Sequence, residues 1–360
     1  MTICLSMIVK NEAHCIEKCL NSVKPFIDYW IICDDTRTTD DTEGVVKRCL
    51  KDIPGEYYQH QWIDCATNRN KSLDLARPKA DYVLVIDADD QLVVNDPNDL
   101  KDLSKLAYTI EYIHGSITYS KVQLFKSTIP AKFIGVVHEC IKLPLNVGST
   151  PLENCKIIYG GNGANSKDPK KYLKAAEILE KELLSDPNNS RYVFYAAQCY
   201  RDANKLPEAF NLYMRRSKMG DWIEEQYVSF LEAGKISEII QPDNFSVAET
   251  MYLSAYNRQS NRMESLAYLV YLCIKKNLFE KAYFYAKIGS QIAKPKDALF
   301  LETACYDWKI IDGLAIAAYY IDKPQESASL NHALLKSGTL PPNEQTRILS
   351  NLEFCETKIY

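Results

Sequence analysis

The sequence YVLVIDADD at residues 82–90 joins a continuous apolar run to three acidic residues. An apolar run of this length suits a strand that is covered on both faces, as in the sheet of an α/β fold. The acids would then follow the carboxyl end of the strand, where open α/β sheets bind ligands. This stretch therefore predicts both the fold class and the position of a binding site.

The acids themselves favour a cation site. Alternation along an extended backbone would place Asp87 and Asp89 on the same side. Two carboxylates so close repel each other unless a cation lies near them. Mg²⁺ and Mn²⁺ accept carboxylate oxygens and bridge to phosphates. A solvated acidic turn is the alternative interpretation.

Short strands and helices alternate on both sides of this stretch, which argues for a parallel or mixed sheet. Strands are predicted at 2–9, 29–33, 56–59 and 82–86, and helices at 12–23, 40–50 and 66–76. Asn11 is a candidate cap for the first helix. Strand signals dominate from 107 to 158, without long helices.

The segment 160–169, GGNGANSKDP, is typical of a linker. After it, Tyr, Ala and Leu recur at helical spacings, and part of the text fits the 34-residue tetratricopeptide template. The fitting positions are Ala197, Tyr200, Ala209, Tyr213, Leu266, Leu269, Ala282, Ala286 and Pro295. Generic helical hairpins are the alternative. We predict two domains, an α/β domain at 1–160 and an all-α tetratricopeptide-like domain at 161–360.

Composition excludes several classes. A net charge of -4 argues against a nucleic-acid partner, and no apolar run reaches the length of a membrane span. The amino-terminal residues do not resemble a signal peptide. The 12 cysteines are scattered and contain no CxxC pair, which favours reduced thiols and a cytoplasmic location. A disulfide framework in a secreted protein is the alternative.

Four ordered motifs carry a resemblance to a known family. They are IVKNE at 8–12, ICDDTRTTDDT at 32–42, ATNRNKSLDLA at 66–76 and DADD at 87–90. In this order and spacing they resemble the family-2 glycosyltransferases of the GT-A fold, a Rossmann-like α/β fold. The resemblance covers roughly residues 2–140.

The resemblance implies roles for individual residues. The positions that match the family's donor-binding motifs are Val9, Asn11, Glu12, Asp35, Arg37, Arg69 and Asp87. Among them, Asp35 would hold the base or ribose, and Asp87 would contact the ribose or the metal. Asp89 would ligate Mn²⁺ or Mg²⁺. Arg37 and Asn68 depart from the family pattern, which usually has Gly and Ala there.

The segment KFIGVVHECI at 132–141 adds His138 and Glu139. By itself, a lone His at a strand end is a structural hydrogen-bonding group, but relatives with a helical-repeat extension carry a similar GxVHE segment. By this resemblance His138 completes the metal site with Asp87 and Asp89, and Glu139 and Asp90 are the candidate catalytic carboxylates. A solvent-facing salt bridge is the alternative for Glu139.

The resemblance implies a metal-dependent hexosyltransferase. It would move a sugar from a nucleotide-diphosphate sugar, a UDP-sugar by preference, to a protein, peptide or glycan acceptor, with inversion. The helical half would select the acceptor, with Arg201 and Asp202 either facing the cleft or capping a helix. One alternative is a nucleotidyltransferase, although no Gly-rich loop follows the first strand. The other is a non-catalytic repeat scaffold.

Overall fold

The structure is a computed structural model that describes residues 1–115, 117–137, 139–164, 168–220, 222–296 and 298–359. The chain divides into two compact units, Met1–Glu182 and Leu183–Tyr360. The strands of the first unit end at Ile158, and the predicted domain boundary at 160/161 remains a prediction. Among the described residues, no helix combines the length and apolarity that a membrane crossing requires.

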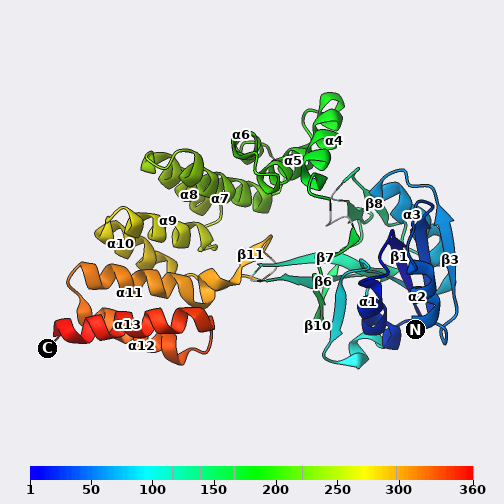
Figure 1. Ribbon diagram of the computed structural model, residues 1–360, viewed down its shortest axis with the longest axis horizontal. Coiled ribbons are helices and arrows are strands. Elements are labelled where there is room, and N and C mark those ends of the chain that lie inside the picture. Colours follow the sequence, from blue (N-terminus) through cyan, green and yellow to red (C-terminus); the bar gives the residue numbers. More distant parts are fainter. Residues whose placement is uncertain (116, 138, 165–167, 221, 297, 360) are drawn as a thin grey trace. The chain divides into compact units, whose positions relative to one another are not determined.

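The first unit is built on one mixed sheet (Figure 1, blue to green). Its strands follow the order β3-β2-β1-β4-β7-β6-β10-β5, and the first four are parallel. β7 is antiparallel to both β4 and β6, and β8 and β9 form a separate two-stranded sheet. The strands are β1 (Ile3–Val9), β2 (Tyr29–Asp35), β3 (Gly55–His60), β4 (Tyr82–Val85), β5 (Gln91–Val94), β6 (Ala107–His114), β7 (Ile117–Lys126), β8 (Lys132–Ile134), β9 (Cys140–Lys142) and β10 (Thr150–Ile158).

Helices cover both faces of this sheet. Alternate residues of β4 point to opposite sides, so Leu84 joins the core under α1 (Ile16–Val23) and α2 (Thr42–Cys49). Val83 joins the core under α3 (Cys65–Ala76). The predicted α/β class and all seven predicted elements up to residue 86 are therefore confirmed, with small shifts in their bounds.

One predicted detail of the first helix is wrong. That helix begins at Ile16 and is not capped by Asn11, which lies in the left-handed region with φ 54°. The Asn11 carboxamide instead accepts the N–H of Thr39 at 2.7 Å. An Asn tolerates this backbone conformation because its short polar side chain bonds locally. Asn11 therefore ties the end of β1 to the loop that follows β2.

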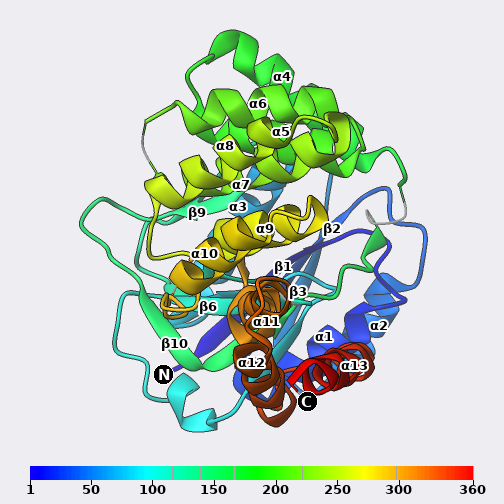
Figure 2. The same cartoon turned by 90° about the vertical axis from the view of Figure 1, so that its left-hand side faces the viewer.

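The second unit is helical and consists of stacked hairpins (Figure 2, green to red). The small and aromatic positions predicted from the repeat template, among them Ala209, Tyr213 and Ala282, are buried. The helices after the sheet are α4 (Lys171–Ser185), α5 (Ser190–Asp202), α6 (Leu206–Ser217), α7 (Ile223–Ile240), α8 (Phe245–Arg258), α9 (Glu264–Lys275), α10 (Phe279–Gly289), α11 (Ile310–Tyr320), α12 (Pro324–Lys336) and α13 (Pro342–Ile359); a short strand, β11 (Leu301–Glu302), and a π-helix (Cys305–Lys309) precede α11.

Three of the hairpins share one turn. Asn204, Asn277 and Asp322 each adopt a left-handed backbone, with φ 58°, 57° and 61°. In each case the next N–H donates to the carbonyl five residues earlier, as in a Schellman motif. These bonds join Lys205 to Tyr200, Leu278 to Cys273, and Lys323 to Ala318. The repeated Asn or Asp, rather than a strict 34-residue spacing, marks the repeats in this sequence.

Candidate functional site

The candidate site lies at the edge of the sheet where the parallel strands β1, β2 and β4 end. Asp87, Asp89 and Asp90 follow β4, and Glu12 follows β1. The chain turns at residues 88–89, so the extended alternation predicted for this stretch does not hold. Asp87 and Asp89 are half-buried, whereas Asp90 is buried at 1% exposure. The three acids therefore lie in different environments.

Arg69 joins two of the predicted site residues. Its Nη2 donates to Asp87 Oδ1 at 2.5 Å, and its Nε donates to Glu139 Oε1 at 2.6 Å. The Arg69 and Glu139 side chains are only 12% and 14% exposed, so the bridge between them is largely out of water. Sequence reasoning placed Arg69 and Asp87 at the donor site and Glu139 with the catalytic groups. The guanidinium brings all three together.

The guanidinium also sets the ionisation of both acids. Burial alone would raise the pKa of the Asp87 carboxyl, but Arg69 outweighs burial and the pKa lies below its ordinary value. The pKa of the Glu139 carboxyl is lowered by the same balance of burial against Arg69. Both groups are therefore carboxylates at neutral pH. Charge-paired acids with shifted pKa values at a strand end are typical of functional sites.

Asn70, which sequence reasoning missed, anchors the segment that carries Glu139. Its side chain donates to the carbonyl of Phe133 at 2.9 Å and accepts the N–H of Phe133 at 2.8 Å. The Phe133 ring in turn lies 5.3 Å from the Arg69 guanidinium. A pair of hydrogen bonds from one side chain to the backbone of a distant segment leaves no signal in the local sequence. Asn70 differs in this respect from Arg69, which the family motif marks.

Asp89 and Glu12 are bound by backbone N–H groups of the segment Gly160–Ala164, which we call the strap. Gly163 N–H donates to Asp89 Oδ2 at 2.9 Å, and Ala164 N–H lies 3.1 and 3.2 Å from the two oxygens of Glu12. Burial raises the pKa of the Glu12 carboxyl, with the nearby Asp89 adding to the effect. The strap belongs to the glycine-rich stretch that the sequence predicts as a linker.

Asp90 is the most isolated of the acids. Its Oδ1 accepts the N–H of Gly160 at 3.1 Å, whereas its buried Oδ2 has no hydrogen-bond partner among the described residues. Burial raises the pKa of the Asp90 carboxyl to about 7, with the Asp87 charge adding to the effect. A buried oxygen without a partner is uncommon in folded proteins and calls for an explanation, such as a catalytic role.

Asp35, at the end of β2, is held by two cations. Arg37 donates to it through Nε at 3.0 Å and Nη2 at 2.5 Å, and Lys10 Nζ lies 3.3 Å away. The hydrogen bonds from Arg37 lower the pKa of the Asp35 carboxyl to about 2. Arg37, which replaces the family's usual Gly, therefore occupies the carboxylate that the resemblance assigns to the nucleoside. Val9, the last residue of β1, is buried and contributes its backbone to this edge.

The oxygen donors fit a hard divalent cation. Asp89 Oδ2 carries the strap bond, and Oδ1 accepts no hydrogen bond from the described residues. A carboxylate oxygen left open in this way is the donor that Mg²⁺ and Mn²⁺ prefer. His138, the predicted third ligand, lies outside the described residues.

A second group of candidate ligands lies beside these acids. In the part of the chain that the structure describes, Glu12, His14 and Cys15 have potential ligand atoms within 4.8 Å of one another. Two of these residues already make hydrogen bonds, because His14 Nε2 donates to the carbonyl of Asn162 at 2.8 Å and the Cys15 thiol donates to Glu12 at 3.1 Å. A thiol also suits softer metals than Mg²⁺.

The other site residues lie in the second unit. Arg201 donates to Asp202 at 2.9 Å and to Glu232 at 2.8 Å, and Lys235 pairs with Glu232 and Glu302. This network joins α5 to α7. Arg201 thus links helices within the repeats through Glu232, and the predicted roles of Arg201 and Asp202 remain predictions.

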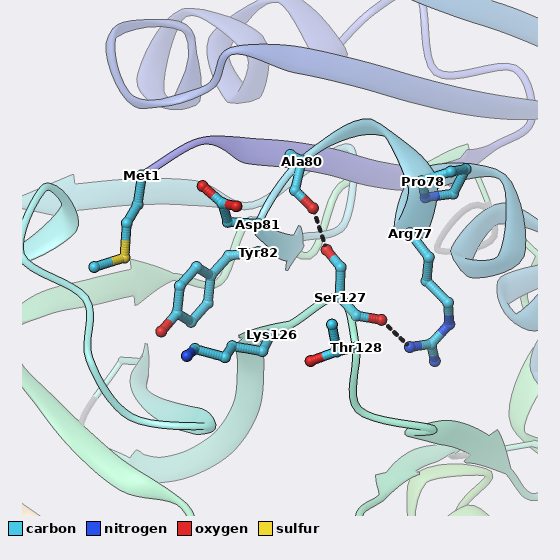
Figure 3. A pocket seen from close by; sticks show the side chains of 9 residues that line it. All are labelled: Met1, Arg77, Pro78, Ala80, Asp81, Tyr82, Lys126, Ser127 and Thr128. Carbon is cyan, nitrogen blue, oxygen red and sulfur yellow. Dashed lines mark hydrogen bonds between the residues drawn. The ribbon is translucent and has the colours of Figure 1, made fainter.

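A cavity of about 690 Å³ lies at the opposite edge of the sheet, before β1 and β4 (Figure 3). Figure 3 shows Ser127 in its wall, donating to the carbonyl of Ala80 and accepting from Arg77. Arg77 donates to the backbone carbonyls of Ile129 and Ala131 as well. Among the residues that line this cavity the one acid is Asp81, which accepts the backbone N–H of Thr2 at 2.8 Å. The cavity therefore does not present the paired acids of the other edge.

Comparisons with known proteins match the first unit to a family. Residues 4–151 match the family model described as Glycosyl transferase family 2. The SPbeta prophage-derived glycosyltransferase SunS of Bacillus subtilis (strain 168) is 27% identical over 233 residues, which are 60% of this chain and 53% of that protein. The chain thus spans about half the length of that relative.

Two further proteins resemble this chain. A TPR repeat-containing protein of Synechococcus elongatus is 29% identical over 146 residues, which are 38% of this chain and 34% of that protein. The crystal structure of S. aureus TarS 1-349 in complex with UDP-GlcNAc covers 72% of this chain and 90% of its own. Its TM-score is 0.35 and its identity 13%.

Proposed function

We propose that this chain, whose residues 4–151 form a glycosyltransferase family 2 domain of the GT-A fold ahead of tetratricopeptide-like repeats, is a glycosyltransferase. The donor would be a nucleotide-diphosphate sugar, a UDP-sugar by preference. The observation that carries the proposal is the group of acids at the carboxyl edge of the sheet, Asp87, Asp89 and Asp90. This group lies inside the segment that matches the family.

Asp87 and Asp89, with His138, would hold Mn²⁺ or Mg²⁺. When bound, the cation would stabilise the negative charge that develops on the leaving diphosphate. Asp35 would bind the nucleoside after exchanging its contact with Arg37 for one with the donor. Because Arg37 is 60% exposed, its side chain can leave Asp35 without crossing a packed core. Val9, Asn11 and Glu12 would line the same edge.

Arg69 would keep Asp87 and Glu139 ionised and fixed in place. For a transfer that inverts the anomeric centre, a carboxylate removes the proton of the acceptor hydroxyl. Glu139 and Asp90 are the two candidates for this base. Glu139 is the first to test, because at 14% exposure it is more open to an acceptor than Asp90 at 1%.

The helical repeats would select the acceptor, a protein, peptide or glycan. Stacked hairpins make extended surfaces that suit long ligands. The proposal also includes a reducing compartment such as the cytoplasm, since the cysteines are scattered along the sequence and contain no CxxC pair.

Calorimetry with UDP tests the proposal. We expect UDP to bind in the presence of Mn²⁺ and to lose most of its affinity when EDTA removes the cation. A screen of UDP-sugars for slow hydrolysis would then identify the donor. Equal UDP affinity with and without the cation would contradict metal dependence, and the absence of binding and hydrolysis with every nucleotide sugar would contradict the proposed function.

A further inference from the structure

The strap contacts the acids of the site through its backbone alone. Its N–H groups at Gly160, Gly163 and Ala164 reach three different carboxylates, and the carbonyl of Asn162 accepts from His14 Nε2. Four of its five residues are thus tied to the ends of β1 and β4. A plain linker would leave these groups to water.

Glycine is required for this approach. A Cβ on Gly160 would lie 1.7 Å from the carbonyl oxygen of Asp89, which no backbone tolerates. A Cβ on Gly163 would lie 3.2 Å from Asp89 Oδ2 and 3.4 Å from Glu12 Oε1. These two glycines therefore let the strap lie directly on the acids. At Gly163 an added methyl group would move the carboxylates by a few tenths of an ångström rather than block folding.

We propose that the strap positions Asp89 for a divalent cation, with Gly163 as the positioning residue. Its N–H fixes Oδ2 and leaves Oδ1 open, and a carboxylate fixed through one oxygen presents the other in a defined direction. Hydrogen bonds of this kind orient metal ligands, and losing one typically costs about 10- to 100-fold in metal affinity. The inference rests on the proposed function, since it assumes that Asp89 is a ligand.

A strap that blocked the acids would change the cation affinity in the opposite direction. If the strap blocked the acids, the cation would have to displace it, and loosening the strap would strengthen cation binding. The geometry favours positioning because Gly163 uses only one of the two Asp89 oxygens. The direction in which Mn²⁺ affinity changes therefore distinguishes the two roles.

The test is a titration of the full chain with Mn²⁺, in which the electron paramagnetic resonance signal of the free ion measures how much Mn²⁺ is bound. Gly163→Ala should bind Mn²⁺ about 10-fold more weakly than the parent. Gly148→Ala is the matched control, because a Cβ there meets nothing within 4 Å, and its affinity should equal that of the parent. Unchanged or tighter binding by Gly163→Ala would overturn the inference.

Thermal unfolding without metal separates positioning from damage to the fold. Gly163→Ala should unfold within about 2 °C of the parent, since its methyl group meets only side-chain atoms. If the melting temperature and the Mn²⁺ affinity fell together, the role would be structural and the inference wrong. If the parent itself bound no Mn²⁺, the metal dependence in the proposed function would fail with it, which a failure of Gly163→Ala alone would not imply.

Discussion

The two edges of the sheet in the first unit differ in what their charged groups contact. At the amino edge, Asp81 accepts the backbone N–H of Thr2 at 2.8 Å, and Arg77 donates to three backbone carbonyls. At the carboxyl edge, Arg69 bridges two carboxylates, and the other acids accept backbone N–H groups of the strap. Charges bonded to backbone hold loops in place. At the carboxyl edge, only the ion pairs of Arg69 join ionised side chains to one another, and they hold Asp87 and Glu139 ionised beside the other acids.

The cavity and the chemistry also lie at different edges. The 690 Å³ cavity is at the amino edge, whereas Asp90, with a buried carboxylate oxygen that has no partner among the described residues, is at the carboxyl edge. In parallel α/β sheets ligands bind at the carboxyl ends of the strands. We therefore base the proposed site on the pairing of its acids and not on the size of a cavity.

The largest expected effect is a loss in the rate of sugar transfer when an acid at the carboxyl edge is replaced. Asp89→Asn keeps the shape of the side chain but removes the charge that would hold a cation. Initial rates with the UDP-sugar found by the screen should fall about 100-fold or more. Asp81→Asn at the amino edge is the matched control and should leave the rate unchanged. Equal rates for Asp89→Asn and the parent would remove the functional difference between the edges.

The next effect is on stability. Arg69→Met leaves Asp87 and Glu139 without their shared cation. Removing one partner of a buried ion pair costs about 3–5 kcal/mol, and because Asp87 is 41% exposed we expect about 2 kcal/mol. Calorimetry of the first unit's transition measures this. Arg77→Met is the matched variant, and it should cost stability without changing Mn²⁺ affinity, whereas Arg69→Met should change both.

A smaller effect concerns pH. The pKa of the Asp35 carboxyl is about 2 in the fold, against about 3.9 when unfolded. A lowered pKa contributes stability that is present above pH 4 and is lost as the pH falls through 2. Because Arg37 is 60% exposed, screening limits the contribution to about 1 kcal/mol.

Urea unfolding at several pH values measures this contribution. Asp35→Asn should be less stable than the parent at pH 6, and the difference should shrink as the pH falls from 4 toward 2. If the difference in stability between Asp35→Asn and the parent stayed constant over this range, the charge of Asp35 would not contribute to stability.

More of the fold than of the candidate site could be predicted from the sequence. Apolar runs and strand–helix alternation depend on local spacing, so the elements around β4 were found. Local spacing could not show that Asn11 bonds to Thr39 rather than to a helix end, because the two residues are far apart in the sequence. Nor could it separate a linker from a strap, since both require glycine. The contact between Gly163 and Asp89 exists only once β4 and β10 share a sheet.

The smallest expected effect comes from filling the cavity at the amino edge. Thr128 is exposed in its wall, and Thr128→Trp would place an indole across it. If the acids at the carboxyl edge are the donor site, UDP affinity in Mn²⁺ and the transfer rate should match those of the parent. We expect this because the cavity and the acids lie at opposite ends of β4. Tyr82, which lines the cavity, begins the strand, and the acids follow Val85, which ends it. Calorimetry with UDP measures the first quantity. A loss of UDP binding in Thr128→Trp, with Asp89→Asn still binding normally, would assign the donor to the cavity and reverse the comparison.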